Sequence, residues 1–164
     1  MIFLINKNGF TFVETMVALT IFAFVMAVAS LVYVKDYYNY AENNQKIEVQ
    51  ENLRFALNRM VRDIRQATVS LDVYDAGGNP SITGPKIKFL SSTGEVIEYG
   101  YDDSDKEIEV KRDAGSPQPI TSGTIKKLDF QRNENSEVIT ITVVGKKIYS
   151  GEIVLSTKVH LRVQ

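Results

Sequence analysis

The feature of this sequence that most constrains its fold is a long stretch without proline or glycine near the start of the chain. It runs from Phe10 to Ala67. Proline and glycine are the residues that most disfavour a helix interior, so their absence over so many consecutive positions favours one long helix. We therefore expect a single helix that begins at Phe10 and continues to Ala67.

The first half of this predicted helix is almost entirely apolar. Between Phe10 and Val34 the only charged residue is Glu14, and charges return immediately afterwards at Lys35. At about 1.5 Å per residue, the stretch is roughly 37 Å long as a helix, which is enough to cross a hydrocarbon core of ~30 Å. The segment 10–34 is therefore predicted to be a membrane-spanning helix or a cleaved signal.

The second half of the helix, residues 35–67, becomes amphipathic. Its apolar side chains recur at alternating intervals of four and three residues, at Leu53, Leu57, Met60, Ile64 and Ala67. This spacing places them on one stripe, which indicates that this half packs against the rest of the protein. Arg59 and Asp63 stand at i, i+4 and can form an ion pair that contributes about 0.2–0.5 kcal/mol.

Beyond Thr68 the apolar residues alternate with polar ones, as in half-buried strands. Strands are expected at 87–89, 96–101, 107–110, 125–130, 138–144 and 153–163. Clusters of turn-forming residues separate several of them, at 75–80, 102–105 and 115–119. Sequential strands with short connections predict one antiparallel sheet of about six strands in residues 68–164, packed on the amphipathic half-helix. The expected fold class is α+β.

Composition excludes several functional classes. The 164 residues include no cysteine and one histidine, and the 19 basic and 20 acidic residues nearly balance. A disulfide framework, a thiolate nucleophile and a cysteine metal site are therefore excluded, and common catalytic triads have few possible members. The charge balance gives no broad attraction for nucleic acid or anionic lipid. We expect a protein that is not an enzyme and needs no cofactor.

The residues just before the apolar helix carry the most specific motif. A basic residue and a glycine, Lys7 and Gly9, precede the aromatic Phe10, and Glu14 follows at the fifth position counted from Phe10. This segment resembles the cleavage and methylation signature of type IV prepilins, which include type IV pilins and type II secretion pseudopilins. The resemblance implies that residues 1–9 are a leader, that prepilin peptidase cuts between Gly9 and Phe10, and that Phe10 is then N-methylated.

The position of Glu14 also has a physical interpretation. An ionisable side chain within a membrane helix is costly, so it needs a partner or a purpose. In a bundle of identical helices, the newly exposed amine of Phe10 lies one helical turn away from Glu14, so an offset neighbouring chain can supply it. Truncating one partner of such a pair in a dry core leaves an unpaired charge. We therefore expect Glu14 to set the register of assembly.

An ordinary secretory signal is the alternative interpretation of the N-terminus. Lys7, the apolar stretch and the small residues Ala27 and Ala29 also fit a signal peptide that is cleaved before Ser30. Its apolar region is usually ~7–15 residues long and seldom contains a glutamate. The two interpretations predict different mature N-termini, Phe10 or Ser30.

Two further segments narrow the resemblance. Residues 50–67 are similar to the end of the helix in PilW- and GspJ-type minor pilins and pseudopilins, and residues 155–163 resemble their terminal strand. This implies a pilin fold and a low-abundance subunit that helps to initiate assembly. The implied partners are prepilin peptidase, other pilins, the assembly platform protein and, before assembly, membrane lipid. The implied location is the cytoplasmic membrane, with the C-terminal domain outside, and then the filament. Type IV pili, type II secretion and competence systems all remain open.

A membrane-anchored extracytoplasmic binding module that never polymerises is the competing function.

The sequence signals for a metal site or a DNA-binding site are weaker. The acidic residues Asp102, Asp103 and Asp105 suggest a calcium loop, but they lack the spacing of one. Acidic residues are also common in turns. His160 has no neighbouring ligand residues in the sequence. The paired lysines 126–127 and 146–147 suggest contact with DNA, but paired lysines also protect sheet edges.

Overall fold

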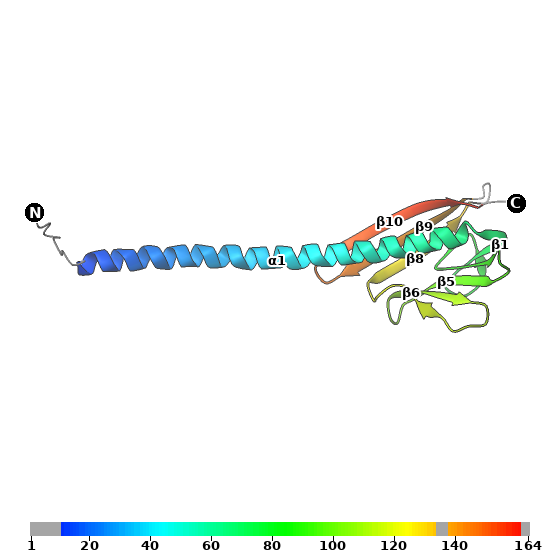
Figure 1. Ribbon diagram of the computed structural model, residues 1–164, viewed down its shortest axis with the longest axis horizontal. Helices are drawn as coiled ribbons and strands as arrows, with labels where there is room; N and C mark the ends of the chain where they lie inside the picture. Colours follow the sequence, from blue (N-terminus) through cyan, green and yellow to red (C-terminus); the bar gives the residue numbers. More distant parts are fainter. Residues whose placement is uncertain (1–10, 134–137, 162–164) are drawn as a thin grey trace, which may run out of the picture. The chain divides into compact units, whose positions relative to one another are not determined.

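The structure is a computed structural model that describes residues 11–133 and 138–161. It comprises two compact units, Met1–Ala41 and Glu42–Gln164. The first unit contains the start of the helix α1 (Phe12–Ile64), and the second contains the rest of that helix and every strand. Figure 1 shows α1 and the strands that follow it in the chain.

The single long helix predicted from the sequence is confirmed, but it begins at Phe12 and not at Phe10, and it ends at Ile64 and not at Ala67. After Ile64 the last turn tightens. The backbone N–H of Gln66 donates to the carbonyl of Asp63, the third residue before it, and not to the fourth as in an α-helix. Ala67 already belongs to strand β1 (Ala67–Tyr74), where it is still buried as the apolar stripe predicted. The β-branched Thr68 that follows favours this extended conformation.

The strands form two antiparallel sheets, so the expectation of one sheet was wrong. The six-stranded sheet contains, in spatial order, β2 (Pro80–Ser81), β1, β4 (Lys86–Ser91), β5 (Val96–Asp102), β6 (Glu107–Arg112) and β7 (Gln118–Pro119). The four-stranded sheet contains β10 (Gly151–His160), β9 (Val138–Lys147), β8 (Ile125–Arg132) and β3 (Thr83–Gly84). The chain passes from the first sheet to the second at Ile82, whose carbonyl accepts the backbone N–H of Arg132 in β8.

The predicted strand segments correspond to β4, β5, β6, β8, β9 and β10, and the predicted turn clusters lie where the strands end. In the first cluster, a carboxylate oxygen of Asp75 accepts the backbone N–H of Asn79 at 2.8 Å. Gly78 in that turn has a φ of 81°, a conformation that favours glycine. The strands that the sequence did not reveal are β1, adjoining the helix end, and three strands of two residues each.

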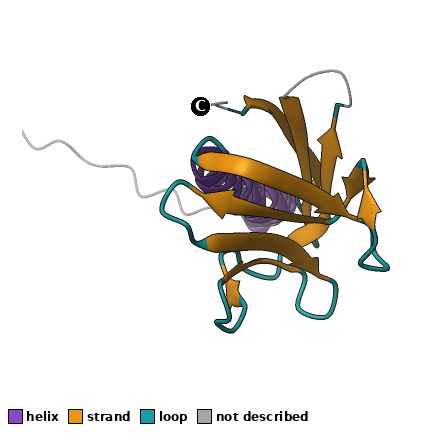
Figure 2. Cartoon of the chain, turned by 90° about the vertical axis from the view of Figure 1, so that its right-hand side faces the viewer, coloured by secondary structure: helices purple, strands orange, loops and turns teal. Residues whose placement is uncertain are grey.

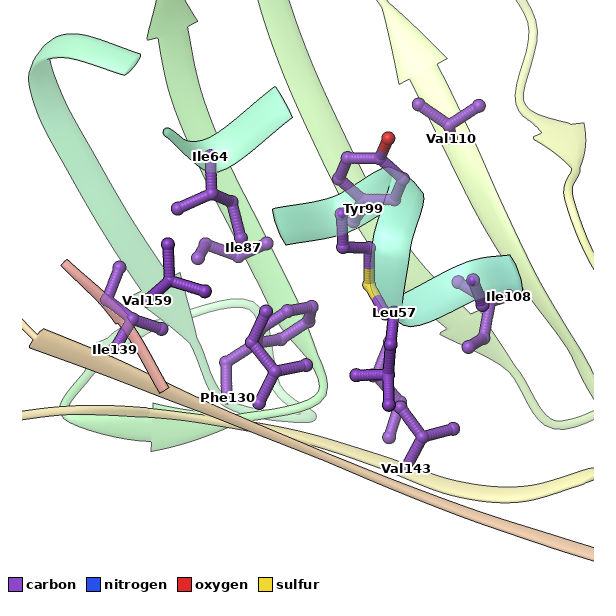
Figure 3. Close-up of a cluster of buried hydrophobic side chains, with 14 of the residues drawn as sticks. Leu57, Ile64, Ile87, Tyr99, Ile108, Val110, Phe130, Ile139, Val143 and Val159 are labelled. Carbon is purple, nitrogen blue, oxygen red and sulfur yellow. The ribbon is translucent and has the colours of Figure 1, made fainter. Parts of the chain in front are cut away.

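The core of the second unit lies between the C-terminal half of α1 and the two sheets (Figure 2). Figure 3 shows side chains from all three layers in contact, with Leu57 and Ile64 from α1, Tyr99 from the first sheet and Phe130 from the second. The helix contributes Val49, Leu53, Ala56, Leu57, Met60 and Ile64 to this core. Each large apolar side chain that is fully buried here stabilises the fold by about 1.5–3 kcal/mol.

A glycine allows α1 to approach the second sheet closely. Gly145 lies in β9 beneath the helix, and a Cβ atom there would lie 2.6 Å from Cγ1 of Val49 and 3.2 Å from Cδ2 of Leu53. Such a distance is shorter than a van der Waals contact, so a larger residue would push the helix away from the sheet. A hydrogen bond between the helix and the hairpin that follows β9 adds to this contact. The backbone N–H of Tyr149 donates to Oε1 of Gln45 at 2.8 Å.

A buried carboxylate joins the end of α1 to the first sheet. Asp63 is 6% exposed, and its Oδ2 accepts the Tyr99 hydroxyl at 2.7 Å and an Arg112 guanidinium nitrogen at 3.2 Å. The guanidinium of Arg112 also donates to Glu95 at 2.7 Å. Among the described residues Arg59 forms no ion pair with Asp63, so the predicted i, i+4 pair was wrong. Asp63 points into the protein, towards partners that are distant in sequence.

The Tyr99 phenol gives this network a predicted pH dependence. Burial, with a smaller contribution from the hydrogen bond to Asp63, raises the pKa of Tyr99 above its ordinary value. The folded protein therefore holds this proton more tightly than the unfolded chain does. The resulting stabilisation is complete below the ordinary tyrosine pKa of about 10 and is lost as the pH rises towards the folded-state pKa. We expect Tyr99→Phe to show a smaller loss of stability between about pH 9 and 11 than the unsubstituted protein.

Denaturant unfolding of both proteins across that pH range measures the difference. The absorbance of tyrosinate provides an independent readout, since the unsubstituted protein should gain the Tyr99 component only as it unfolds. Equal slopes of unfolding free energy against pH for the two proteins would contradict the prediction.

Candidate assembly site at the start of the helix

The N-terminus of α1 is closed by two residues that cap each other. The backbone N–H of Glu14 donates to the hydroxyl of Thr11 at 3.3 Å. In return, the backbone N–H and the hydroxyl of Thr11 donate to Oε2 of Glu14 at 2.8 and 2.9 Å. This is the reciprocal arrangement of a capping box, in which a Thr-x-x-Glu sequence satisfies backbone donors at the helix start.

This geometry gives Glu14 a partner within its own chain. The carboxylate lies in the first turn of α1, where the helix dipole favours negative charge. The two hydrogen bonds from Thr11 also hold it close to the end of the helix. Gly9 and Phe10, the predicted cleavage pair, lie outside the described residues. The pairing of Glu14 with the amine of a neighbouring Phe10 therefore stays a prediction, and Thr11 is a residue at this site that the sequence analysis overlooked.

The helix that follows presents apolar side chains on all sides. Every residue from Thr11 to Tyr40 is exposed in the isolated chain. The large apolar residues include Phe12, Leu19, Phe22, Phe24 and Leu31, each more than half exposed. By length and composition α1 is able to cross a membrane. A surface of this kind requires either lipid or other apolar helices around it.

The few polar side chains in this segment are satisfied within the helix. The hydroxyls of Thr20 and Ser30 each donate to the backbone carbonyl one turn earlier, at 2.8 Å in both cases. Their hydrogen-bonding groups therefore need no water, which suits an apolar environment. Ser30, the first mature residue under the alternative signal-peptide interpretation, lies inside the continuous helix.

Tyrosines gather where the apolar stretch ends, a signal that the sequence analysis did not use. Tyr33, Tyr37, Tyr38 and Tyr40 are each more than half exposed, and the rings of Tyr37 and Tyr38 meet edge to face at 6.2 Å. Tyrosine is enriched at membrane–water interfaces because its ring is apolar and its hydroxyl is polar. These residues are suited to mark the boundary between the lipid and the second unit.

Comparison with known families supports the interpretation of this N-terminus. Residues 4–30 match the model of the prokaryotic N-terminal methylation motif. The match spans Gly9, Phe10 and Glu14. The chain therefore carries the type IV prepilin-like signature. No curated protein and no solved structure matches the chain.

The prepilin-like signature indicates a protein that is processed by prepilin peptidase and associates with other pilins in a filament. Members of this class are structural subunits. The long apolar helix packed on antiparallel sheets is an α+β pilin-like architecture, as predicted. The signature and the helix together fit a single-pass, membrane-anchored protein.

The weaker candidate sites take part in local structure. In the acidic turn, Asp102 accepts the backbone N–H of Ser104 at 2.8 Å, and Asp103 accepts the hydroxyl of Tyr101 at 3.1 Å. Within residues 11–133 and 138–161, no three His, Cys, Asp or Glu side chains are grouped so that they could hold a metal ion. His160 is exposed on β10.

Three of the four lysines considered for DNA contact form ion pairs with the protein's own carboxylates. Lys126 forms an ion pair with Glu152, and Lys146 lies 3.9 Å from the same carboxylate. Lys147 pairs with Glu48 of α1 at 2.5 Å. These pairs reduce the positive charge that these lysines can offer to a phosphate backbone.

Proposed function

We propose that this chain is a minor pilin or pseudopilin of a type IV filament machine that helps to initiate assembly. Prepilin peptidase cuts between Gly9 and Phe10 and methylates Phe10. The mature subunit then waits in the cytoplasmic membrane, with the unit Glu42–Gln164 outside, until the assembly platform protein transfers it to the filament.

The observation that carries this proposal is the exposed apolar segment of α1 from Phe12 to Val34, whose one carboxylate, Glu14, is held in the first turn of the helix and lies within the match to the methylation motif. A subunit that leaves the bilayer must bury this surface again, and parallel helices of other subunits provide an equally apolar environment. Glu14 then sets how far neighbouring helices are offset, because its charge is best paired with the amine of an adjacent Phe10.

The minor-subunit part of the proposal draws on the resemblance of residues 50–67 to PilW- and GspJ-type helices. In this chain the same segment supplies the buried stripe from Leu53 to Ile64 and the buried Asp63. An initiating subunit needs the assembly helix of the family and a domain surface of its own, and the two-sheet unit provides such a surface.

The mature N-terminus tests the proposal. When the full-length gene is expressed, the protein purified from these cells is expected to begin at N-methylated Phe10. Mass spectrometry of its N-terminal peptide determines this. The protein is also expected in the sheared filament fraction in small amounts. A mature chain that begins at Ser30, or one that keeps residues 1–9 while it functions, would overturn the proposal. A correctly processed chain that stays in the membrane beside intact filaments would instead favour the binding module.

Deletion of the gene tells the filament systems apart. Loss of piliation, of protein secretion or of DNA uptake would each identify one of the three machines.

A further inference from the structure

A basic groove lies between the end of α1 and the end of β10. It has a volume of about 550 Å³ and is lined by Asn58, Val61, Arg62, Arg65, Gln66 and His160. The Arg62 side chain is 70% exposed and lies 3.6 Å from Asp63, a carboxylate already bound by Tyr99 and Arg112. In the described part of the chain, Arg65 forms no ion pair. The groove therefore has uncompensated positive charge.

An acidic hairpin connects β5 to β6 in the same unit. It comprises residues 102–107, and its charged residues are Asp102, Asp103, Asp105, Lys106 and Glu107. Within residues 11–133 and 138–161, none of these side chains forms an ion pair. Asp102 and Asp103 accept hydrogen bonds from the hydroxyls of Ser104 and Tyr101, which are neutral and do not cancel a charge. The hairpin therefore has an excess of negative charge.

A neighbouring carboxyl group responds to this excess. Burial raises the pKa of Glu109 in β6, and the charges of Asp102, Asp105 and Glu107 raise it further, while Lys86 opposes them. Like charges raise the pKa of a carboxyl because they disfavour its ionised form. The hairpin carboxylates therefore act together on the surface around them.

The acidic hairpin and the basic groove lie apart on the second unit. Figure 1 shows β6 and β10 on opposite sides of the C-terminal end of α1. The hairpin adjoins the loop before β8, since the carbonyl of Lys106 accepts the backbone N–H of Ile125. That loop meets α1 at Asn52, whose side chain donates to the hydroxyl of Ser122 at 2.8 Å. From Asn52 to Arg62 in the groove, the helix rises by about 15 Å.

We propose that the acidic hairpin of a second copy of this chain docks in the basic groove, where Asp103 and Asp105 of the hairpin pair with Arg62 and Arg65. Pairs between arginine and a carboxylate are among the stronger charge-assisted hydrogen bonds. A parallel copy that is displaced by about 15 Å along α1 has its hairpin at the level of the groove. The contact joins two different surfaces, so each copy keeps a free groove or a free hairpin for the next one.

A second copy is favoured over other partners because it satisfies both charged surfaces at once. A nucleic acid would pair with the arginines of the groove but would be repelled by the hairpin. An unrelated acidic protein would leave the hairpin without counter-charges. A symmetric contact between two copies, groove against groove or hairpin against hairpin, would bring like charges together, which disfavours that arrangement.

The inference deepens the proposed function and rests on it for the parallel alignment of the copies. Parallel helices place every hairpin on one side of its unit and every groove on the other, so a contact of this kind can be repeated along a filament. An initiating subunit that binds a second copy of itself can start such a series. The contact itself lies within the second unit, so its test needs neither processing of the leader nor a filament.

Cross-linking of the full-length protein in micelles of an uncharged detergent tests the proposal. The chain has no cysteine, so single cysteines can be placed at will. Asn58→Cys lies in the groove and Ser104→Cys in the hairpin, and neither change removes a charge. With a short bismaleimide, a mixture of the two variants is expected to give the product that joins them, whereas each variant alone is expected to give none. Different epitope tags on the two variants tell the products apart.

Charge reversal provides the second arm. Arg62→Glu with Arg65→Glu in the groove variant is expected to lower the yield of the mixed product about tenfold or more. Asp103→Lys with Asp105→Lys in the hairpin variant is then expected to restore it.

A matched control separates this effect from that of net charge. Lys88→Glu with Lys127→Glu makes the same change in net charge as the reversed groove, at two exposed positions outside it, and is expected to leave the yield unchanged. Circular dichroism checks that all variants remain folded, and labelling with a fluorescent maleimide checks that both cysteines are accessible.

Several results would overturn the inference. The first is the absence of a mixed product although both cysteines are accessible. The second is a mixed product that the reversed groove does not weaken or the reversed hairpin does not restore. Cross-linking of the Asn58→Cys variant with itself would instead indicate a symmetric contact, such as pairing of two β10 edges. Loss of the mixed product to a single-stranded oligonucleotide that the reversed groove no longer binds would assign the groove to nucleic acid.

Discussion

A Glu14→Leu chain is expected to enter the membrane and lose its leader but to be absent from filaments. Leucine is compatible with the lipid, so insertion should not suffer. In the filament, however, the amine of the adjoining Phe10 would be left without its counter-charge in an apolar core, and truncation of one partner in such a pair is strongly destabilising. The amount of processed protein in the membrane and in sheared filaments, measured by immunoblotting, gives the partition directly.

The capping box provides the matched controls for this experiment. Glu14→Gln keeps an oxygen that accepts the hydrogen bonds of Thr11 but removes the charge. If the charge sets the register, the glutamine variant fails to assemble as the leucine variant does. Thr11→Ala keeps the charge and removes the hydroxyl that caps the helix, and it is expected to assemble. Normal assembly of Glu14→Leu would refute the role of this residue, and normal assembly of Glu14→Gln alone would reduce that role to helix capping.

The sequence predicted the features that depend on local order. The stretch without helix breakers, the apolar span and the stripe from Leu53 to Ile64 are all properties of consecutive residues, and the structure confirms the helix and its buried face. The capping box was readable in the same way, because Thr11 and Glu14 have the spacing that defines it. The tyrosines from Tyr33 to Tyr40 were equally visible in the sequence. These two omissions were missed signals and not limits of the sequence.

The division of the strands between two sheets was not readable from the sequence. It depends on residues 80–84, where two strands of two residues each belong to different sheets. Segments so short carry no periodicity. Strand β1 was obscured because its first residue, Ala67, continues the apolar spacing of the helix. In each case the outcome is decided by pairing with residues far away in the chain, such as Phe89 opposite Leu71.

The partners of Asp63 show the same dependence on distant residues. By local rules an acidic residue in the last turn of a helix is unfavourable, because the helix dipole is negative there. The sequence offered Arg59 as its nearest partner at helical spacing. In the structure its partners are Tyr99 and Arg112, which reach it from neighbouring strands of the first sheet. A local conflict is thus resolved by contacts that exist only in the folded protein.

We therefore expect Asp63→Ala to destabilise the second unit by about 2–4 kcal/mol, one of the largest effects of any single substitution in this unit. The substitution leaves the hydroxyl of the fully buried Tyr99 without an acceptor and Arg112 without one of its two carboxylates. The loss falls below that of a fully buried ion pair, because the Arg112 side chain is 41% exposed and water can solvate it. Chemical denaturation of the full-length protein, followed by circular dichroism of the strands, measures the change.

Two comparisons separate this network from general effects at the helix end. Arg62→Ala removes an exposed neighbour of the same carboxylate and is expected to cost about 0–0.5 kcal/mol. In the double substitution Asp63→Ala with Tyr99→Phe, the unsatisfied hydroxyl is removed together with its acceptor, so the combined loss should be clearly smaller than the sum of the single losses. Strict additivity, or an Asp63→Ala protein as stable as the unsubstituted one, would show that the network does not fix the helix to the sheet. A combined loss clearly smaller than the sum would instead show that Asp63 and Tyr99 stabilise the protein through the hydrogen bond that they share. The buried carboxylate of Asp63 would then be what holds the end of α1 against the first sheet.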